Sequence, residues 1–197
     1  KPGREFGGDL SAEFGSWDLR RVRGHINAPL VGDQLLSRLS FQRTSRDGYV
    51  DNVNLPGSKS GDIDLTSARG QLLFVPMSKL QVNLSIDHSN SRNSSYQSEV
   101  VASESTFPAG GDDRKYSYNG VIQPVDLKRD TGLALTADYS FDSGHTLTSI
   151  TGVRETTTRW VFSDDATPRG FQKQDLRDQQ EIWSQEVRLA SPSATFF

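Results

Sequence analysis

The sequence contains no cysteine. This absence excludes structural disulfides, cysteine-ligated zinc and thiol nucleophiles, and it leaves both the cytoplasm and the cell envelope open as compartments. The chain also has no strong excess of charge, because its formal net charge is −3 and residues of both signs are interspersed. It has no basic stripe that would neutralise a phosphate backbone. Nucleic acid is therefore not an expected partner.

Long apolar runs are absent as well. The longest lies near Leu72 to Val75, far short of a transmembrane helix. Only 34% of the residues are hydrophobic, and the mean hydropathy is −0.59. Disordered chains have such compositions, but here the apolar residues fall at alternate positions in separate stretches, which disorder does not produce. A transmembrane β-barrel is compatible with low hydropathy, because only one side of each strand meets lipid.

Motifs of catalysis and metal binding are missing too. The histidines His25, His88 and His145 are far apart, and no HExxH, P-loop, GxGxxG or GxSxG motif is present. Asp112-Asp113 and Asp164-Asp165 could bind calcium, but neither pair has the spacing of an EF-hand loop. We therefore expect a protein that is not an enzyme and that has no cofactor and no resident metal.

What the sequence does contain is alternation with a period of two. Between Leu80 and Asp87, apolar and polar residues alternate without exception. This pattern predicts a β-strand with one apolar face. One stretch is ambiguous, because Leu147 and Val153 have one parity and Ile150 has the other. Strands are predicted at residues 6–14, 21–28, 35–43, 68–75, 80–87, 133–141, 146–154 and 183–189.

The predicted connections alternate in length. A tight turn at 15–17 joins the first two strands. The later short turns are at 31–34, 76–79 and 142–145, and the long loops are at 44–64, 88–130 and 156–181. Short turns at one end and long loops at the other are typical of outer-membrane barrels, and strands of about ten residues match their crossing length. Aromatic residues near strand ends could form interface girdles or simply reflect strand preference: Phe6, Phe14, Trp17, Phe41, Phe74, Phe141 and Trp183.

Several segments together resemble the barrel of TonB-dependent receptors. The opening KPGREFGGDLSAEFGSWDLRRVRGHINAPL resembles the exit from the plug domain and the first barrel hairpin of that family. Further similar segments are LSRLSFQRTSRDGYVDN, ARGQLLFVPMSKLQVNLSIDHS, LTSITGVRE and SQEVRLAS. Their order and spacing carry the resemblance, which covers most of the chain and is weakest in the long loops.

The resemblance implies an all-β fold and a place in the outer membrane of a Gram-negative bacterium. Residues 1–197 would form an antiparallel meander of about eight transmembrane strands, the front part of a barrel of about 22 strands. The chain begins at Lys1-Pro2-Gly3 without an initiator methionine, so we expect a mature segment or fragment that lacks the plug domain and the C-terminal strands.

The resemblance also implies partners. They are outer-membrane lipid, the receptor's own plug domain, the TonB complex acting through a region N-terminal to this segment, and a small-molecule ligand. Members of the family most often capture ferric siderophores or cobalamin and sometimes sugars. A ferric siderophore is the default expectation, while cobalamin, sugars and other metal chelates stay open.

Loop aromatics are the candidate ligand-binding residues, because their rings could stack on an aromatic siderophore or a sugar, although such rings also pack loops together. These candidates are Tyr49, Tyr96, Tyr116, Tyr118 and Trp160. A second set of charged residues is predicted to face the barrel interior: Glu13, Arg21, Arg23, Arg38, Arg69, Asp87 and Glu186. It could hold a plug or a ligand, but a water-lined wall needs the same charges, and that structural role is favoured.

Two other architectures remain open at this stage. A complete eight-stranded outer-membrane barrel would have an even strand number and a C-terminal Phe196-Phe197, but Ser191-Pro192-Ser193 interrupts the eighth strand before that end. A soluble β-sandwich binding module would show the same alternation. For the receptor fragment we expect a curved, open antiparallel sheet with an unpaired edge strand on each side.

Overall fold

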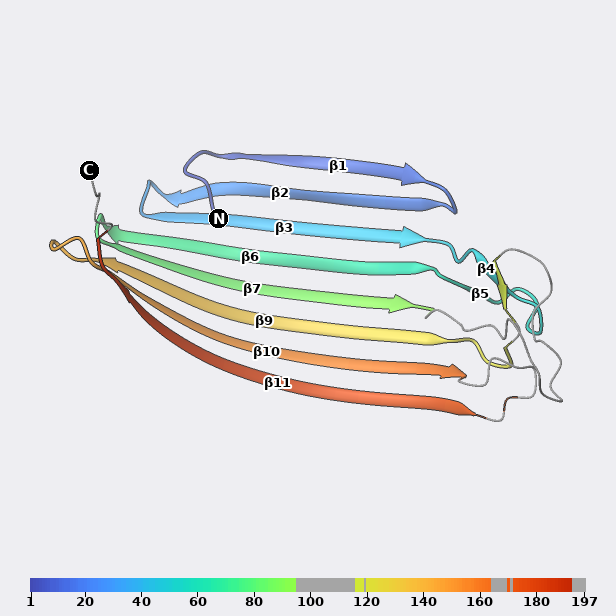
Figure 1. The fold of residues 1–197 in the computed structure, drawn as a ribbon. Coiled ribbons are helices and arrows are strands. Elements are labelled where there is room, and N and C mark those ends of the chain that lie inside the picture. Colours follow the sequence, from blue (N-terminus) through green and yellow to red (C-terminus); the bar gives the residue numbers. More distant parts are fainter. Residues whose placement is uncertain (95–115, 119, 164–169, 171, 193–197) are drawn as a thin grey trace, which may run out of the picture.

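Eight long strands form a single antiparallel sheet in which neighbours along the chain are neighbours in space (Figure 1). The computed structural model describes residues 1–94, 116–118, 120–163, 170 and 172–192. The long strands are β1 (Gly7–Gly15), β2 (Leu19–Val31), β3 (Leu35–Arg46), β6 (Ile63–Met77), β7 (Leu80–Asn93), β9 (Val125–Ser140), β10 (Thr146–Ser163) and β11 (Lys173–Ala190). The eight strands predicted from the alternation are thereby confirmed, as is the all-β antiparallel fold. The described part of the chain holds no helix with the length and hydropathy of a membrane span.

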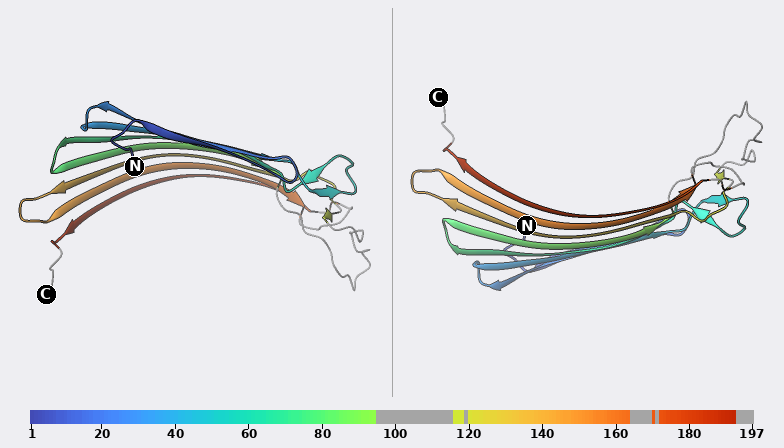
Figure 2. Two further views of the ribbon diagram at one scale, coloured as in Figure 1. Left: turned by 90° about the horizontal axis from the view of Figure 1, so that it is seen from above. Right: turned by 90° about the horizontal axis from the view of Figure 1, so that it is seen from below.

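The sheet is open. The strand order begins with β1 and ends with β11, and these two strands are not paired with each other. Figures 1 and 2 show one curved layer of strands that bend along their length. The open, curved sheet expected for a receptor fragment is confirmed, whereas the eight described strands do not close into a ring.

The pairing register gathers the apolar residues on one face. One row across neighbouring strands consists of Leu39, Gly70, Ile86, Leu133, Val153 and Trp183. Its large side chains are exposed, from 38% for Val153 to 67% for Trp183. The register also resolves the ambiguous strand, because Leu147 and Val153 share this apolar face and Ile150 lies on the other.

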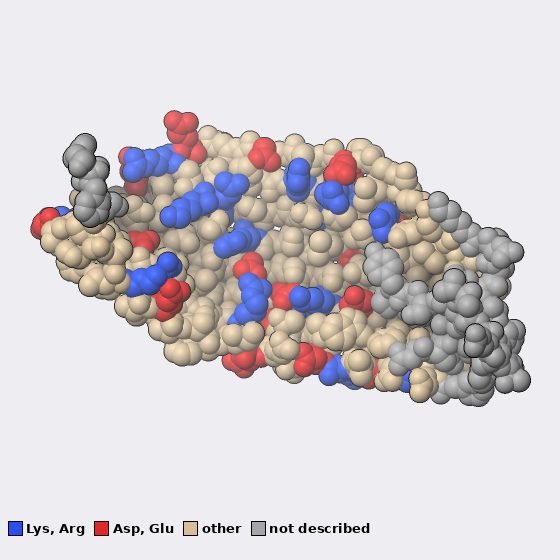
Figure 3. Space-filling model, viewed as in Figure 1, with Lys and Arg blue, Asp and Glu red and all other residues tan. Residues whose placement is uncertain are grey.

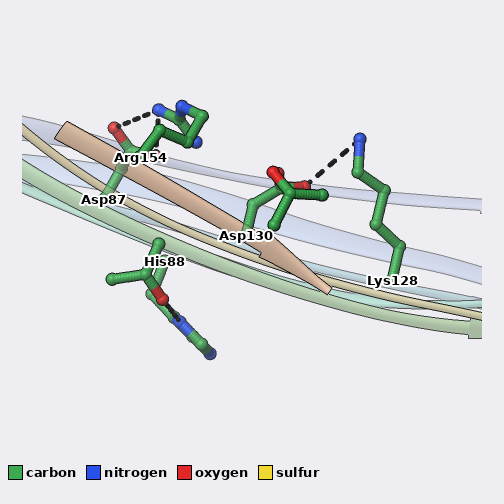
Figure 4. Close-up of polar contacts among 7 residues, drawn as sticks. Asp87, His88, Lys128, Asp130 and Arg154 are labelled. Carbon is green, nitrogen blue, oxygen red and sulfur yellow. Dashed lines mark hydrogen bonds and ion pairs between the residues drawn. The ribbon is translucent and has the colours of Figure 1, made fainter. Parts of the chain in front are cut away.

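The opposite face is polar and lies on the concave side of the sheet. Lysine, arginine, aspartate and glutamate side chains are scattered over it (Figure 3). Ser85 and Thr44 have the parity of this face and are only 3% and 2% exposed. Figure 4 shows the two sides directly: Asp87, Asp130 and Arg154 rise from one side of the strands, and His88 points away on the other.

The strands reach further toward the long-loop end than predicted. The long loops were expected at residues 44–64, 88–130 and 156–181, whereas the long strands are separated there by residues 47–62, 94–124 and 164–172. The extensions of β9 and β10 place Arg129 and Arg159 on the face that is apolar elsewhere. Because polar residues such as these interrupt the apolar face there, the regular alternation is lost and the sequence pattern does not distinguish strand from loop.

Close packing at Gly8 provides a test of the register. A Cβ atom at Gly8 would lie 2.3 Å from the His25 carbonyl oxygen, whereas one at Gly7 would have no atom within 4 Å. We expect Gly8→Ala to force β1 from β2 and to destabilise this edge by about 1–3 kcal/mol. The measurement is amide hydrogen exchange of residues 7–15 in the full-length protein, with Gly7→Ala as the control. Equal exchange in the two variants would contradict this register.

Candidate functional site

A small second sheet joins two of the long connections at one end of the strands. It consists of β4 (Val50–Asn52), β5 (Lys59–Ser60) and β8 (Ser117–Tyr118). β4 pairs antiparallel with β5 and parallel with β8. The Tyr49 N–H donates to the Ser60 carbonyl at 3.0 Å, and the Asp51 N–H donates to the Tyr116 carbonyl at 2.9 Å. The connection at 47–62 is therefore bound to a segment about 60 residues further along the chain.

Tyr118 is the central side chain of this small sheet. It is 2% exposed, and its hydroxyl oxygen accepts a hydrogen bond from the Ser60 hydroxyl at 3.1 Å. Gly120 lies against its ring, because a Cβ atom there would be 2.9 Å from the Tyr118 Cε2 atom. Of the two roles considered for loop aromatics, packing of the loops is the one that this burial supports.

Three other rings form what we call the aromatic cluster: Trp17, Tyr49 and Tyr116. The ring centroids of Trp17 and Tyr49 are 4.8 Å apart, and those of Tyr49 and Tyr116 are 5.7 Å apart in an edge-on arrangement. The Arg46 guanidinium lies 5.0 Å from the Tyr49 ring centroid, within the range of a cation–π contact. The cluster joins the β1–β2 turn, the connection after β3 and the residue before β8.

Two members of the aromatic cluster have an unusual backbone conformation. Trp17 and Asp18 have φ values of 56° and 55°, in a tight turn closed by the Leu19 N–H and the Ser16 carbonyl at 3.3 Å. Tyr116 has a φ of 64°. This left-handed region is costly for residues with a Cβ atom, and at Trp17 and Asp18 it is the conformation that a tight hairpin turn requires. Its effect here is to present Trp17 and Tyr116 to solvent, at 49% and 48% exposure.

A polar cleft of about 660 Å³ opens beside the aromatic cluster. Its size lies in the usual range for small-molecule sites. Gln123 ties its wall together, because its side-chain amide donates to the Lys59 carbonyl and to the Ser94 hydroxyl, both at 2.9 Å. Trp17, Arg46, Lys59 and Asp62 also line the cleft, so a ligand there would meet an aromatic ring and charges of both signs.

The structure brings only some of the predicted site residues together. Tyr49 and Tyr116 meet in the aromatic cluster, while Tyr96, like the aspartate pairs considered for calcium, lies outside the described residues. The prediction that Trp160 belongs to a loop is wrong, because it lies in β10, which runs on to Ser163. It pairs with Asp126 and Leu176. Trp17 was missed as a site residue, and its position in a tight turn at the long-loop end was the available signal.

The concave polar face carries paired polar and charged side chains, both across strands and along one strand. Glu13 contacts Arg21 at 2.7 Å, and Asp9 contacts His25 at 2.6 Å. Arg23 donates to the Ser11 hydroxyl, and Glu186 pairs with Arg188. Arg38 and Arg69 have no carboxylate within ion-pair distance in the described ranges. Exposed pairs of this kind add little stability, so the arrangement suits a wetted wall.

One ion pair on this face bridges three strands. Asp87 on β7, Gly132 on β9 and Arg154 on β10 form one row of the register. The Arg154 Nη2 atom lies 2.9 Å and 3.1 Å from the two Asp87 carboxylate oxygens (Figure 4). A Cβ atom at Gly132 would be 2.4 Å from that nitrogen. Glycine at this position therefore leaves the space through which Arg154 reaches Asp87.

Tyr49 is the ring on which the aromatic cluster depends. We expect Tyr49→Ala to remove two ring contacts and the Arg46 contact, each ring contact contributing about 0.5–1.5 kcal/mol. Hydrogen exchange of residues 46–62 in the full-length protein should then become faster. The control is Tyr139→Ala, which removes a ring 4.9 Å from Phe141 near the short-turn end. Unchanged exchange in Tyr49→Ala would show that the small sheet holds the loop without the aromatic cluster.

Comparison with known proteins identifies the fold. No known protein-family profile matches the sequence. The crystal structure of the ferric yersiniabactin uptake receptor FyuA from Yersinia pestis aligns with 100% of this chain at a TM-score of 0.82 and 16% sequence identity. The chain spans 29% of the length of that receptor. At this identity the likeness concerns the fold alone, and it shows that the chain is folded like part of that structure.

Proposed function

We propose that this chain is part of an outer-membrane receptor that takes up a ferric siderophore, or a similar scarce nutrient, by TonB-dependent active transport. The observation that carries the proposal is the two-faced sheet. One face is an exposed apolar band, and the concave face is polar. Lipid on one side and a plugged, water-lined interior on the other would satisfy both faces.

The height of the apolar band supports a membrane location. On the outer side of β9 and the turn after it, apolar residues run from Leu133 to Phe141. Eight residue steps correspond to about 27 Å along the strand and, at a tilt of about 40°, to roughly 21 Å along the membrane normal. This is close to the apolar band of about 25 Å found on outer-membrane barrels.

The single layer argues against the two other architectures. In a soluble sandwich the apolar face would be covered by a second sheet, whereas residues such as Leu10, Ile86 and Trp183 are 71%, 55% and 67% exposed in this chain. In a small closed barrel β1 would pair with β11, which it does not do among the described residues. A larger barrel would pair both edges with strands outside this segment.

The loop end supplies a part of the ligand site in this proposal. Trp17 and Tyr116 would stack on a ligand with conjugated or sugar rings, and Arg46 holds Tyr49 behind them. A plug domain and further strands would supply the rest of the site. The name of the similar solved structure, a ferric yersiniabactin uptake receptor, makes a ferric siderophore the first ligand to test.

Orientation can be tested by cysteine labelling, since this segment has no cysteine of its own. We expect Asn54→Cys, in the connection between β4 and β5, to react with a membrane-impermeant maleimide on intact cells. Ser78→Cys, in the short turn between β6 and β7, should react only after the outer membrane is permeabilised. Both variants are made in the full-length protein with any cysteine outside this segment replaced by serine.

Two outcomes of the labelling experiment would contradict the proposal. Reaction of both cysteines on intact cells would contradict a membrane-spanning sheet. Reaction of Ser78→Cys alone would place the long loops in the periplasm and contradict the proposed orientation.

Uptake tests the ligand. A strain deleted for the gene and complemented with the full-length protein should accumulate radiolabelled iron from ferric yersiniabactin or from a ferric catecholate. Trp17→Ala combined with Tyr116→Ala should weaken the apparent affinity by about tenfold, the loss expected from one or two ring contacts. Deletion of TonB should abolish accumulation while leaving surface binding in place.

The matched control for uptake is Tyr139→Ala, which removes a ring near the opposite end of the sheet. Uptake of cyanocobalamin in place of both iron complexes would keep the transport proposal and change its ligand. Accumulation that continues without TonB would contradict active transport.

A further inference from the structure

Arginines follow one another along the concave face of β2, β3 and β6. On β3 the residues of this face run from Arg38 to Arg46 in steps of two. Each of these positions is an arginine or lies directly opposite one: Arg46 itself, Thr44 opposite Arg21, Gln42 opposite Arg23, Ser40 opposite Arg69, and Arg38 itself. We call these five arginines the arginine line. In Figure 3 basic side chains follow one another across this half of the concave face.

Successive members of the arginine line are close enough to share one ligand. Two residues correspond to about 7 Å along a strand, and neighbouring strands are about 5 Å apart. The line begins at the candidate ligand site, because Arg46 lines the polar cleft and contacts the Tyr49 ring. From there it continues toward the short-turn end as far as Arg38. A ligand with several anionic groups could therefore contact two arginines at each step away from the cleft.

The half of the arginine line nearer the short turns has little compensating charge. Glu13 pairs with Arg21 at 2.7 Å, and the Arg46 guanidinium donates to the Gly61 carbonyl at 2.6 Å. Arg38 and Arg69, in contrast, have no carboxylate within ion-pair distance among the residues that the structure describes. Their guanidinium groups are therefore available to an anion from outside this segment.

The carboxylate opposite Arg69 is held by another residue. Asp87 is the direct partner of Arg69 in the register of β6 and β7. Both of its carboxylate oxygens nevertheless accept from the Arg154 guanidinium, which reaches across Gly132 from β10. Asp87 therefore neutralises Arg154 and leaves the charge of Arg69 uncompensated.

A hollow of about 390 Å³ lies beside Arg69 on the concave face. The hydroxyl-bearing residues Ser40, Ser67 and Ser89 line it together with Arg69 and Arg154. Its volume is in the range of small-molecule sites. A guanidinium donates two parallel hydrogen bonds to an oxyanion, and serine hydroxyls add further donors. The hollow is therefore suited to a carboxylate or phenolate group.

From this arrangement we propose that the arginine line is a second ligand-binding surface, inside the barrel, for a complex of net negative charge that carries carboxylate or phenolate groups. The inference rests on the proposed function and names the substrate class of that transport. The complex would leave the cleft at Arg46 and would be held in the hollow beside Arg69 on its way across the membrane.

Uptake by the full-length receptor tests the charge of the ligand. The probes are an anionic ferric triscatecholate and a neutral ferric trishydroxamate, both with radiolabelled iron. We expect Arg38→Gln combined with Arg69→Gln to lower uptake of the anionic complex by about tenfold more than uptake of the neutral one, since two charge-assisted donors are lost. Because binding at the cleft comes first, the loss should appear in the maximal rate more than in the concentration that gives half-maximal uptake.

The charge-matched control is Lys79→Gln combined with Arg188→Gln. Lys79 pairs with Asp142 at the short-turn end, and Arg188 pairs with Glu186 on β11, so neither belongs to the arginine line. This control should take up both complexes like the unaltered receptor. Heat-modifiable migration on gels checks that every variant is folded.

Gly132→Ala tests the same surface without removing an arginine. A Cβ atom there would be 2.4 Å from the Arg154 Nη2 atom, so Arg154 has to leave Asp87. Asp87 is then free to pair with Arg69, and uptake of the anionic complex should fall by about threefold. Asp87→Asn in the same variant should restore uptake. The control is Gly152→Ala, where a Cβ atom would be 3.1 Å from the Ser184 hydroxyl oxygen.

Thiol labelling measures the surface without any transported ligand. Ser40→Cys lies opposite Arg69, and it is labelled in the purified full-length receptor after other cysteines are replaced by serine. An anionic methanethiosulfonate reagent should react faster than a cationic one, and the ratio of the two rates should fall by about tenfold in the Arg38→Gln and Arg69→Gln background. Ser184→Cys, in the row of Arg38 but on β11, should keep its ratio, because the distance of about 24 Å exceeds the Debye length.

Four results would overturn the inference. Unchanged uptake in the Arg38 and Arg69 variant would show that the arginine line does not contact the ligand. Equal loss of both complexes would indicate that the line holds an acidic segment of the plug domain. Failure of Ser40→Cys to react with either reagent would show that this surface is covered. Uptake of the neutral complex or cyanocobalamin, with the anionic complex refused, would exclude the proposed substrate class.

Failure of this inference is distinguishable from failure of the proposed function. A receptor that transports only neutral complexes would keep the proposed function and lose the arginine line. Absence of uptake with every probe, together with the expected reagent ratios at Ser40→Cys, would contradict transport and leave an anion-binding wall.

Discussion

Cross-strand hydrogen bonding in one continuous register is the constraint on which the rest of this structure depends. Each long strand between the two edges has a neighbour on both sides, so its backbone groups are satisfied within the sheet. Once the backbone is fixed, a side chain can point only to one face of the sheet or to the other. Its odd or even position along the strand decides which face. The apolar band and the charged concave face are two results of this one rule.

Most of the fold could be predicted from the sequence, because the alternation of apolar and polar residues along a strand is a local property. Eight stretches of alternation were sufficient to find the eight long strands, and connection lengths placed the loops at one end. The ends of the strands could not be predicted from the sequence, for a physical reason. From Thr131 and Glu155 toward the long-loop end, polar residues interrupt the apolar outer face, so the regular alternation is lost.

Less of the candidate site could be predicted from the sequence, because the site depends on contacts between segments that are far apart in the chain. Residue type alone singled out Tyr49 and Tyr116, but it could not separate them from Tyr118, which is buried against Ser60. Nor could it show that Trp17 lies against Tyr49, because their contact arises only when the β1–β2 turn and the end of β3 are side by side. Trp160 was placed in a loop because β10 continues through a stretch without alternation.

The parallel pairing of β4 with β8 has a mechanical consequence. Asp51 opposite Ser117 and Asn52 opposite Tyr118 close a chain loop that contains β6 and β7. The entropic cost of closure grows only with the logarithm of loop length, so a few backbone hydrogen bonds and one buried ring are able to hold it. The two connections are therefore tied together where β4 pairs with β8. A force applied to either of these paired strands is shared with the other.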